Sequence, residues 1–418
     1  MPNSGFRRFW AGQTASQLGE HTSLVILPLL AVLTLDVGAS QLGLLRAVGQ
    51  APLLLLALLA GAWVDRWQPR TVMVLADLGR ALALGVAGVA ALIGGLGLPA
   101  LLVISFAVGS LSVLFDVAYQ SFLVRLVDRD HLLRATSAVE GSRSAAQMAG
   151  PALGGFLVSA LSAPLAATSA AGVFVVSALS LVRIRQRFAS TSGPRRIRDG
   201  VAFVIRHPVL RPICFASAAF NFFFAATMTV YLLFLPRALG LSAAGIGLAL
   251  AATGPGALVG SLLAVRLPRR TGYGPAIVGA ALISDGVLLL APALHGGSAS
   301  TVTALITINL VFGVFGQLVN VAVMTVRQSV TPHPLQGRVA ATITFAGMGL
   351  TPVGSLLGGI LADRWGLRLA LVVMASGMLL SPILMALSPV ARLGRRLDGN
   401  GMHMRFSDSR FRSGSNEA

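Results

Sequence analysis

The side chains of this chain best suited to chemistry are ionisable groups set inside long apolar runs. Glu20 lies about eleven residues into the first run, and Gln13, Ser16 and Gln17 precede it at helical spacing, on one stripe. At ~1.5 Å per residue, a helix that crosses a membrane would hold Glu20 ~16 Å deep. An ionisable group at that depth costs about 2.5–3.5 kcal/mol, which makes it a functional candidate by default.

Two roles are open for Glu20. Because burial disfavours its charged form, it can act as a proton or cation acceptor, with Gln13 and Gln17 lining an aqueous cavity beside it. The alternative is a satisfied hydrogen bond between helices. His21 points about 100° away around the helix, and although it can also titrate, packing or hydrogen bonding is the simpler expectation.

A second group of charges lies in the third, fourth and fifth apolar runs, at Asp77, Arg80, Asp116, Glu140 and Arg143. Each is about six to nine residues from the same boundary of its run, so all share one layer at roughly 9–14 Å depth. Asp77 with Arg80, and Glu140 with Arg143, are i, i+3 pairs that can neutralise each other. The pattern predicts a gate closed by ion pairs, with Asp116 and Glu140 as further proton acceptors. Static charge compensation during assembly is the alternative.

Membrane-spanning helices must position these residues. The chain is 55% hydrophobic and 11% charged over 418 residues, with a mean hydropathy of +0.81, whereas soluble domains are about 25% charged. A helix needs about 20 apolar residues to cross a ~30 Å hydrocarbon core. The sequence therefore predicts an all-α polytopic membrane protein with twelve transmembrane helices, near residues 9–34, 41–62, 71–94, 99–121, 135–159, 164–183, 209–235, 241–264, 274–293, 299–326, 339–361 and 367–388.

The arginines predict the orientation of these helices. All 32 basic residues are arginine, and most fall in alternate connections and in the C-terminal tail, while the other connections hold only Arg237, Arg364 and Arg368. By the positive-inside rule, both termini are cytoplasmic in a multi-pass protein of the plasma membrane. The formal charge of +18 is then a topology signal, and no basic soluble domain is present to bind nucleic acid.

Several chemistries are excluded by composition. Without lysine, neither a Walker A loop nor Schiff-base catalysis is possible. Cys214 is the one cysteine and the six histidines are scattered, so no metal site is expected. The buried polar groups form no nucleophile, base and orienter constellation either. We expect no catalytic residues, no cofactor and no enzyme activity.

The chain divides into four parts: residues 1–183 and 209–390 with six helices each, a linker at 184–208, and a polar tail at 391–418. Within the linker, Arg198–Arg206 is predicted to form a short amphipathic helix. The two halves resemble each other at a nearly constant offset, which pairs Asp77 with Asp285 and Gly154-Gly155 with Gly358-Gly359. Parallel repeats of this kind predict two pseudo-symmetric bundles facing a central path.

Two motifs resemble those of a known family. The loop Gly61-x-x-x-Asp65-Arg66-x-x-x-Arg70 between the second and third runs resembles the signature loop of the major facilitator superfamily. Gly150-Pro151-Ala-Leu-Gly154-Gly155 in the fifth run resembles the end of the motif described for its exporters. The segment from Arg198 to Pro208 and the phrase Leu361-Ala-Asp363-Arg364-Trp-Gly366 are similar to its branch of drug, macrolide and siderophore exporters.

The resemblance covers about residues 6–390 and implies the major facilitator fold and secondary active transport. It also implies that the loop with Asp65, Arg66 and Arg70 steadies the outward-facing state; Asp77, Arg80 and Arg143 belong to the gate that the charged layer predicts. Aromatic residues beside a few polar groups suit a bulky apolar or amphipathic ligand. The candidate substrate contacts are Phe115, Tyr119, Asn221, Phe224, Tyr231, Gln317 and Asn320, in addition to Gln13 and Gln17.

The leading interpretation is a proton-coupled exporter of hydrophobic or amphipathic small molecules, such as an antibiotic, drug or siderophore. Its expected partners are that small-molecule substrate, protons and membrane lipids, and the expected state is a monomer. A lipid or lysolipid carrier, or an importer of the same fold, is the alternative within transport. A membrane receptor or scaffold that transports nothing is the alternative from another class, and it gives no reason for Glu20 at the midplane.

Overall fold

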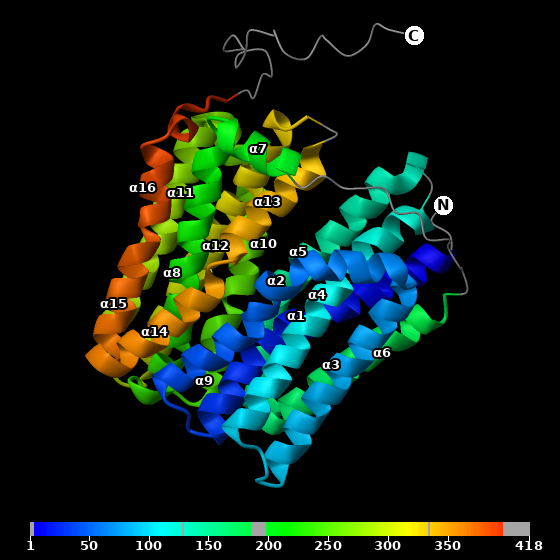
Figure 1. Ribbon diagram of the computed structural model, residues 1–418. Coiled ribbons are helices and arrows are strands. Elements are labelled where there is room, and N and C mark those ends of the chain that lie inside the picture. The colour runs from blue at the N-terminus through cyan, green and yellow to red at the C-terminus, as the bar shows by residue number, and fades with distance from the viewer. Residues whose placement is uncertain (1–3, 128, 185–197, 333–334, 396–418) are drawn as a thin grey trace, which may run out of the picture.

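The computed structural model describes residues 4–127, 129–184, 198–332 and 335–395, and for some helical residues, among them 57–66, it describes the backbone alone. Within these ranges the chain is helical and contains no strand (Figure 1). Ten helical segments are long and apolar enough to cross a membrane, and each coincides with a predicted run. The runs 41–62 and 135–159 form the helices α2 and α5.

The first half of the chain contains six helices: α1 Ser4–Thr34, α2 Ala39–Arg66, α3 Pro69–Leu92, α4 Leu98–Leu126, α5 Arg129–Leu161 and α6 Ala163–Val182. The predicted amphipathic segment is α7, Arg198–Arg206. The second half contains α8 Leu210–Arg237, α9 Ala243–Ala251, α10 Thr253–Thr271, α11 Tyr273–Val287, the 3-10 helix η1 Leu288–Ala293, α12 Ala299–Val330, α13 Gln336–Met348, α14 Thr351–Trp365, α15 Leu367–Met378, α16 Leu380–Ala386 and the 3-10 helix η3 Pro389–Arg392.

The segment Gly61–Arg70 is not the loop that its charges predict. Helix α2 continues through Arg66, and only Trp67 and Gln68 separate it from α3. Pro69 is the first residue of α3, where its missing N–H has no helical partner to lose, so it starts a helix here instead of ending one.

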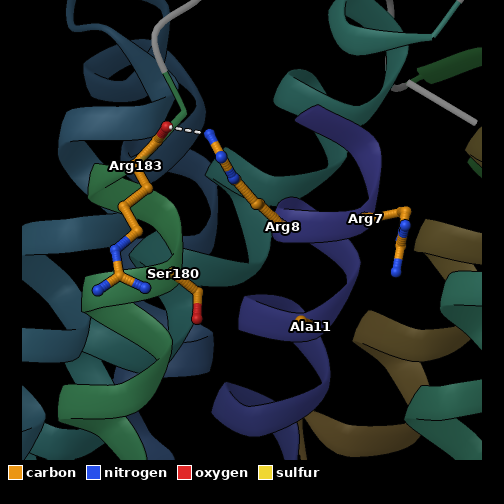
Figure 2. A pocket seen from close by; sticks show the side chains of 5 residues that line it. All are labelled: Arg7, Arg8, Ala11, Ser180 and Arg183. Atoms are coloured by element: carbon orange, nitrogen blue, oxygen red, sulfur yellow. Dashed lines mark hydrogen bonds between the residues drawn. The ribbon is translucent and has the colours of Figure 1, made fainter. Parts of the chain in front are cut away.

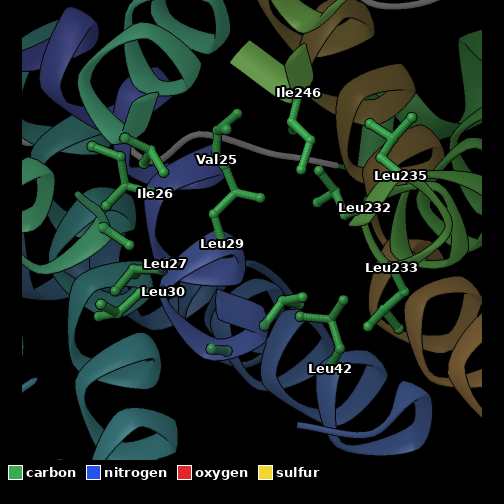
Figure 3. Packing of buried hydrophobic residues seen from close by; sticks show 14 of the residues in the cluster. Val25, Ile26, Leu27, Leu29, Leu30, Leu42, Leu232, Leu233, Leu235 and Ile246 are labelled. Carbon is green, nitrogen blue, oxygen red and sulfur yellow. The ribbon is translucent and has the colours of Figure 1, made fainter. Parts of the chain in front are cut away.

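The helices form two groups, α1–α6 and α8–α16, which lie together at one end of the molecule and diverge toward the end that carries α7 and the N-terminus (Figure 1). We call the end where the two groups lie together the closed end; it carries the connection from α1 to α2. The groups pack on each other mainly through α2 with α14 and through α5 with α9. One buried apolar cluster joins them there, with Leu29 and Leu42 on one side and Leu232 and Ile246 on the other (Figure 3).

Glycines allow the two groups to touch backbone to backbone. A Cβ at Gly247 of α9 would lie 2.6 Å from the carbonyl oxygen of Gly155, and a Cβ at Gly43 of α2 would lie 2.7 Å from that of Ser355 and 3.1 Å from the Cα of Gly359. Such distances exclude any larger side chain, as in close helix pairs of other membrane proteins.

The internal repeat has a structural counterpart at these glycines. Gly154 packs on α1, where a Cβ would lie 2.8 Å from the oxygen of Thr22, and Gly358 packs on α8, where a Cβ would lie 2.6 Å from the oxygen of Ala226. The next residue in each pair, Gly155 or Gly359, faces the opposite group. The predicted correspondence of the two glycine pairs therefore reflects equivalent packing in two pseudo-symmetric bundles.

Candidate functional site

Arg80 of α3 is the centre of a polar cluster inside the first group. Its side chain has no exposed surface. One terminal nitrogen contacts Asp77 Oδ1 at 2.5 Å and Ser16 Oγ at 2.8 Å, and the other contacts Glu20 Oε2 at 3.4 Å and Ser112 Oγ at 3.2 Å. We call Glu20, Asp77 and Arg80 the ion cluster; through Ser16 and Glu20 of α1 and Ser112 of α4, the one guanidinium of α3 ties three helices together.

Two aromatic rings fix the guanidinium of Arg80 from its faces. The ring of Phe115 lies 4.6 Å from its central carbon, and the ring of Phe174 lies 4.5 Å from it. A desolvated cation between two ring faces gains about 2 kcal/mol or more at each ring. The positive charge is therefore held in place independently of Glu20.

Asp77 is the fully satisfied acid of the ion cluster. Its side chain has no exposed surface, and it accepts hydrogen bonds from Ser16 at 2.9 Å and from Ser177 of α6 at 2.5 Å, besides its contact with Arg80. Both carboxylate oxygens of Asp77 are thus partnered, although Nε of Arg80 is not. Removing one member of a buried ion pair leaves an uncompensated charge, at about 3–5 kcal/mol.

Glu20 is more exposed than Asp77 and lies farther from Arg80. Its side chain is 20% exposed, and its contact with Arg80, at 3.4 Å, is the longer of the two ion pairs. Glu20 is therefore the member of the ion cluster that water or a ligand can reach. The structure joins Glu20 to a pair that the sequence places in a separate, shallower layer.

A second set of polar side chains lies on α4 and α5. Asp116 accepts a hydrogen bond of 3.2 Å from Gln17, which lies one turn before Glu20 on α1. Arg143 contacts Glu140 at 3.8 Å and donates to the hydroxyl of Tyr119 at 3.5 Å. The side chains of Glu140 and Arg143 are 41% and 40% exposed, so this i, i+3 pair is present but far more open than that of Asp77 and Arg80.

The residues of the two family motifs have distinct contacts. Arg70 donates to the carbonyl oxygens of Leu181, at 3.1 Å, and of Val182, and so caps the C-terminal end of α6. The side chains of Gly61, Asp65 and Arg66 lie outside the described residues. In the second motif, Gly150 packs directly on His21 of α1, so His21 lies against α5. The next residue, Pro151, is half-buried.

The predicted substrate contacts are divided between core and surface. Phe115, Tyr119 and Tyr231 are buried, and the hydroxyl of Tyr231 accepts a hydrogen bond from Asn309 at 2.8 Å. Phe224 stacks between Phe220, at 5.3 Å, and Phe312, at 5.6 Å. Asn221 and Gln317 are half-buried and Asn320 is exposed. Only these last residues and the Phe224 stack offer accessible surface in this conformation.

Seven buried side chains carry an atom without a hydrogen-bond partner among the described residues. They include both amide atoms of Gln13, one turn below Ser16 and Gln17, Nε of Arg80, and Oδ2 of Asp285 in the second group. Within the same residues, no group of three or more His, Cys, Asp or Glu side chains could hold a metal ion.

The closed end carries polar contacts between the two groups that the sequence analysis missed. Arg237, at the end of α8, pairs with Asp36 at 2.6 Å and donates to the carbonyl oxygen of Val37 at 2.8 Å. Asp363, near the end of α14, accepts hydrogen bonds from the backbone of Ala39 and Ser40 at the start of α2. The similarity of the phrase around Asp363 to an exporter motif was a signal for that residue; Asp36 carries none.

Known proteins match almost the whole chain. The sequence pattern of the Major Facilitator Superfamily matches residues 9–351. An uncharacterized MFS-type transporter, YfiS of Bacillus subtilis (strain 168), is 27% identical over 384 residues, which cover 88% of this chain and 89% of the relative. The multidrug efflux pump Tap of Mycobacterium tuberculosis (strain ATCC 25618 / H37Rv) is 29% identical over 385 residues, with 85% and 87% covered.

Solved structures with the same fold include a bacterial homolog of the human lysosomal transporter Spinster in an inward-facing, unoccupied conformation. It has a TM-score of 0.70 at 14% identity and covers 93% of this chain and 96% of its own. A bacterial homologue of the iron transporter ferroportin in an inward-facing state has a TM-score of 0.67 at 17% identity, with 91% and 97% covered. At these identities the likeness concerns the fold alone.

Proposed function

Since this chain belongs to the major facilitator superfamily, we propose that it is a proton-coupled exporter of hydrophobic or amphipathic small molecules that works by alternating access. Relatives that are multidrug efflux pumps support export and a broad substrate class. We also propose that it lies in the plasma membrane with both termini in the cytoplasm, as the arginine distribution favours. In that orientation, the closed end faces outward.

The charge balance of the ion cluster carries the proposal. Asp77 and Arg80 neutralise each other in a buried pair, so Glu20 is the surplus acid of the three. The cluster is neutral only when Glu20 holds a proton or faces a cationic ligand. A low-dielectric site favours the neutral arrangement, so a proton or a cationic ligand supplies the positive charge that the ion cluster lacks.

Competition for one carboxylate gives exchange. A proton on Glu20 weakens its contact with Arg80 and removes the attraction for a cationic or polar substrate group; loss of the proton restores both. Because Arg80 stays clamped by Asp77, Phe115 and Phe174, the change is confined to Glu20. Gln17, one turn before Glu20 on α1, donates to Asp116 of α4, a second surplus acid that we assign to proton entry and exit.

The remaining candidate residues take the roles of gate and recognition surface. The exposed pair Glu140 and Arg143 belongs, in this proposal, to the gate on the side opposite the closed end, together with the α2–α3 connection. The Phe224 stack with Gln317 and Asn320 supplies flat apolar surface with hydrogen-bonding groups from the second bundle. Coupling thus resides in the first bundle and more of the recognition in the second.

Transport of a fluorescent cationic amphiphile by the full-length chain in proteoliposomes tests this function. An imposed pH gradient should drive transport in the wild type, and an uncoupler should abolish it. Glu20→Gln fixes the site in its neutral form, so it should lose the gradient response and should also bind the cationic amphiphile more weakly than the wild type does. Glu140→Gln removes an equally charged but 41% exposed carboxyl that this proposal assigns to the gate, so it should lower the transport rate but keep the gradient response.

Other results identify the alternatives. Transport that ignores the gradient in the wild type would indicate a facilitator or a carrier of lipid or lysolipid, and transport in the opposite sense would indicate an importer. No movement of any amphiphile, with intact folding, would favour a receptor or scaffold. A Glu20→Gln variant that still responds to the gradient would remove Glu20 from the coupling mechanism.

A further inference from the structure

A cavity with three arginines lies between α1 and α6 at the N-terminal end of the molecule (Figure 2). Its volume is about 440 Å³, and it is lined by Arg7, Arg8, Ala11, Ser180 and Arg183. None of the lining residues is acidic. Within the described part of the chain, no ion pair involves any of the three arginines, so their charges have no protein counter-ion there.

The backbone at this cavity is held independently of any ligand. Arg8 donates to the carbonyl oxygen of Arg183 at 2.9 Å, and Arg70 donates to those of Leu181 and Val182. The guanidinium of Arg183 takes no part in this capping; it extends along α6 toward Ser180 (Figure 2). The cavity thus presents a preformed wall and a guanidinium with its hydrogen-bond donors available.

The cavity lies where a lipid headgroup would be. The membrane-spanning segment Ala163–Val182 ends immediately before Arg183. One to two turns farther into that segment, Leu179, Val176 and Val175 are 53%, 58% and 38% exposed on the surface of α6. A row of exposed apolar side chains below a cationic rim matches an acyl chain below a phosphate.

A groove beside this row extends the apolar surface. It has a volume of about 640 Å³ between α3 and α6, and it is lined wholly by apolar residues and glycines, among them Leu82, Val86, Gly172 and Val175. A groove without a polar side chain has no group that would orient a polar ligand, whereas it fits hydrocarbon.

We propose that the cavity binds the phosphate of an anionic phospholipid, with an acyl chain along the exposed face of α6. Guanidinium groups bind phosphate oxygens through two parallel hydrogen bonds, which suits the free donors of Arg183. The three uncompensated positive charges favour a lipid with net negative charge over a zwitterionic one. This site is separate from the ion cluster and holds whether or not the transport proposal is correct.

The binding of phosphatidylglycerol to the full-length chain, measured by native mass spectrometry in a neutral detergent, tests the site. Arg183→Gln should weaken the Kd about fivefold, the change that ~1 kcal/mol per basic residue gives. Arg269→Gln, which removes an exposed arginine from the last turn of α10, is the matched control and should change it less than twofold. Phosphatidylcholine should bind more weakly than phosphatidylglycerol to the wild type.

A second variant tests the cavity apart from its charge. Ser180→Trp keeps all three arginines and fills the space between them, so it should also weaken phosphatidylglycerol binding. Equal losses in Arg183→Gln and Arg269→Gln, or no loss in Ser180→Trp, would overturn the proposal in favour of diffuse attraction to the basic surface. Displacement of the lipid by millimolar inorganic phosphate would overturn it in favour of a site for soluble anions.

Discussion

Asp363 accepts a hydrogen bond from the backbone N–H of Ser40 at 2.9 Å, although 323 residues separate them in the chain. Its other oxygen accepts from Ala39 at 3.1 Å, so one carboxylate of α14 caps the first turn of α2 in the opposite bundle. A negative charge at a helix N-terminus is stabilising by about 0.3–1 kcal/mol, and up to ~2 kcal/mol when partly buried. Closure of this end is therefore favoured by a charge and a helix dipole.

Asp363→Asn should weaken that closure. The amide keeps the size of the side chain but loses the charge and one acceptor, so the population with α2 and α14 apart should rise several-fold. Spin labels at Gln41→Cys and Arg364→Cys, both at exposed positions, in a Cys214→Ala background would report the distance distribution. Asp363→Glu retains the charge and serves as the control; identical distributions for the wild type and Asp363→Asn would show that the cap has no influence on closure.

A single methyl group at the glycine contact should also oppose closure. In Gly247→Ala the new Cβ would lie 2.6 Å from the oxygen of Gly155, and backbone cannot rotate away as a side chain can. Overpacking of this kind costs about 1–3 kcal/mol, which predicts a roughly fivefold or larger fall in transport rate. Gly279→Ala, where a Cβ meets no atom within 4 Å, is the control and should transport normally. Equal rates for both variants would mean that α5 and α9 need not approach this closely.

Asp77 and Glu20 should differ in their effect on stability. Asp77→Asn leaves Arg80 without its closest counter-charge in a site with no exposed surface, and should lower the midpoint of thermal unfolding markedly. Glu20→Gln removes the longer, partly exposed contact, and should change that midpoint little. Unfolding followed by tryptophan fluorescence in detergent compares the two. A larger loss in Glu20→Gln would reverse the assignment of structural and functional acid.

The start of α8 should loosen in mild acid. His207 Nδ1 accepts from the backbone of Val209, at 3.2 Å, and Leu210, at 3.4 Å, which requires a neutral ring, and partial burial lowers the pKa of His207 from its usual 6.5. Since the folded pKa lies below the unfolded one, this contribution to stability is present above about pH 6.5 and is lost as the pH falls toward the folded value.

Hydrogen exchange of the first turn of α8 at pH 7.5 and pH 5.5, corrected for intrinsic rates, measures this effect. In His207→Asn an amide oxygen can accept the same bonds without titrating, so the pH dependence should disappear. A dependence that persists in the variant would assign it to another group.

The sequence predicted the helices because they follow from composition and period. The i, i+3 pair of Asp77 and Arg80 needed only the geometry of one helix. The contact of Glu20 with Arg80 could not be predicted, since it depends on how α1 and α3 are rotated against each other. Phe174 and Ser177 are ordinary residues for an apolar helix, and nothing local marks them as partners of Arg80 and Asp77.

The misassigned loop at Gly61–Arg70 has a local cause. Charges beside a glycine and a proline are typical of connections, but α2 continues through Asp65 to Arg66. The proline then begins the following helix. The apolar candidate surface in the second group of helices could not be predicted. Three consecutive phenylalanines in α8 point all round the helix and mark no single face, and only packing shows that Phe224 stacks between Phe220 and Phe312.

The glycine contacts between α5 and α9 and between α2 and α14 bear on kinetics as well as on fit. Where backbone meets backbone, no rotamer has to be reset when the surfaces part or rejoin, and the Cα–H···O contacts there are worth only about 0.5–1 kcal/mol each. Separation at these glycines therefore meets little internal friction. The rate of switching should be governed by the few charged contacts around these glycines at the closed end. Single substitutions at those charged residues should therefore change the turnover number while the helices themselves remain unchanged.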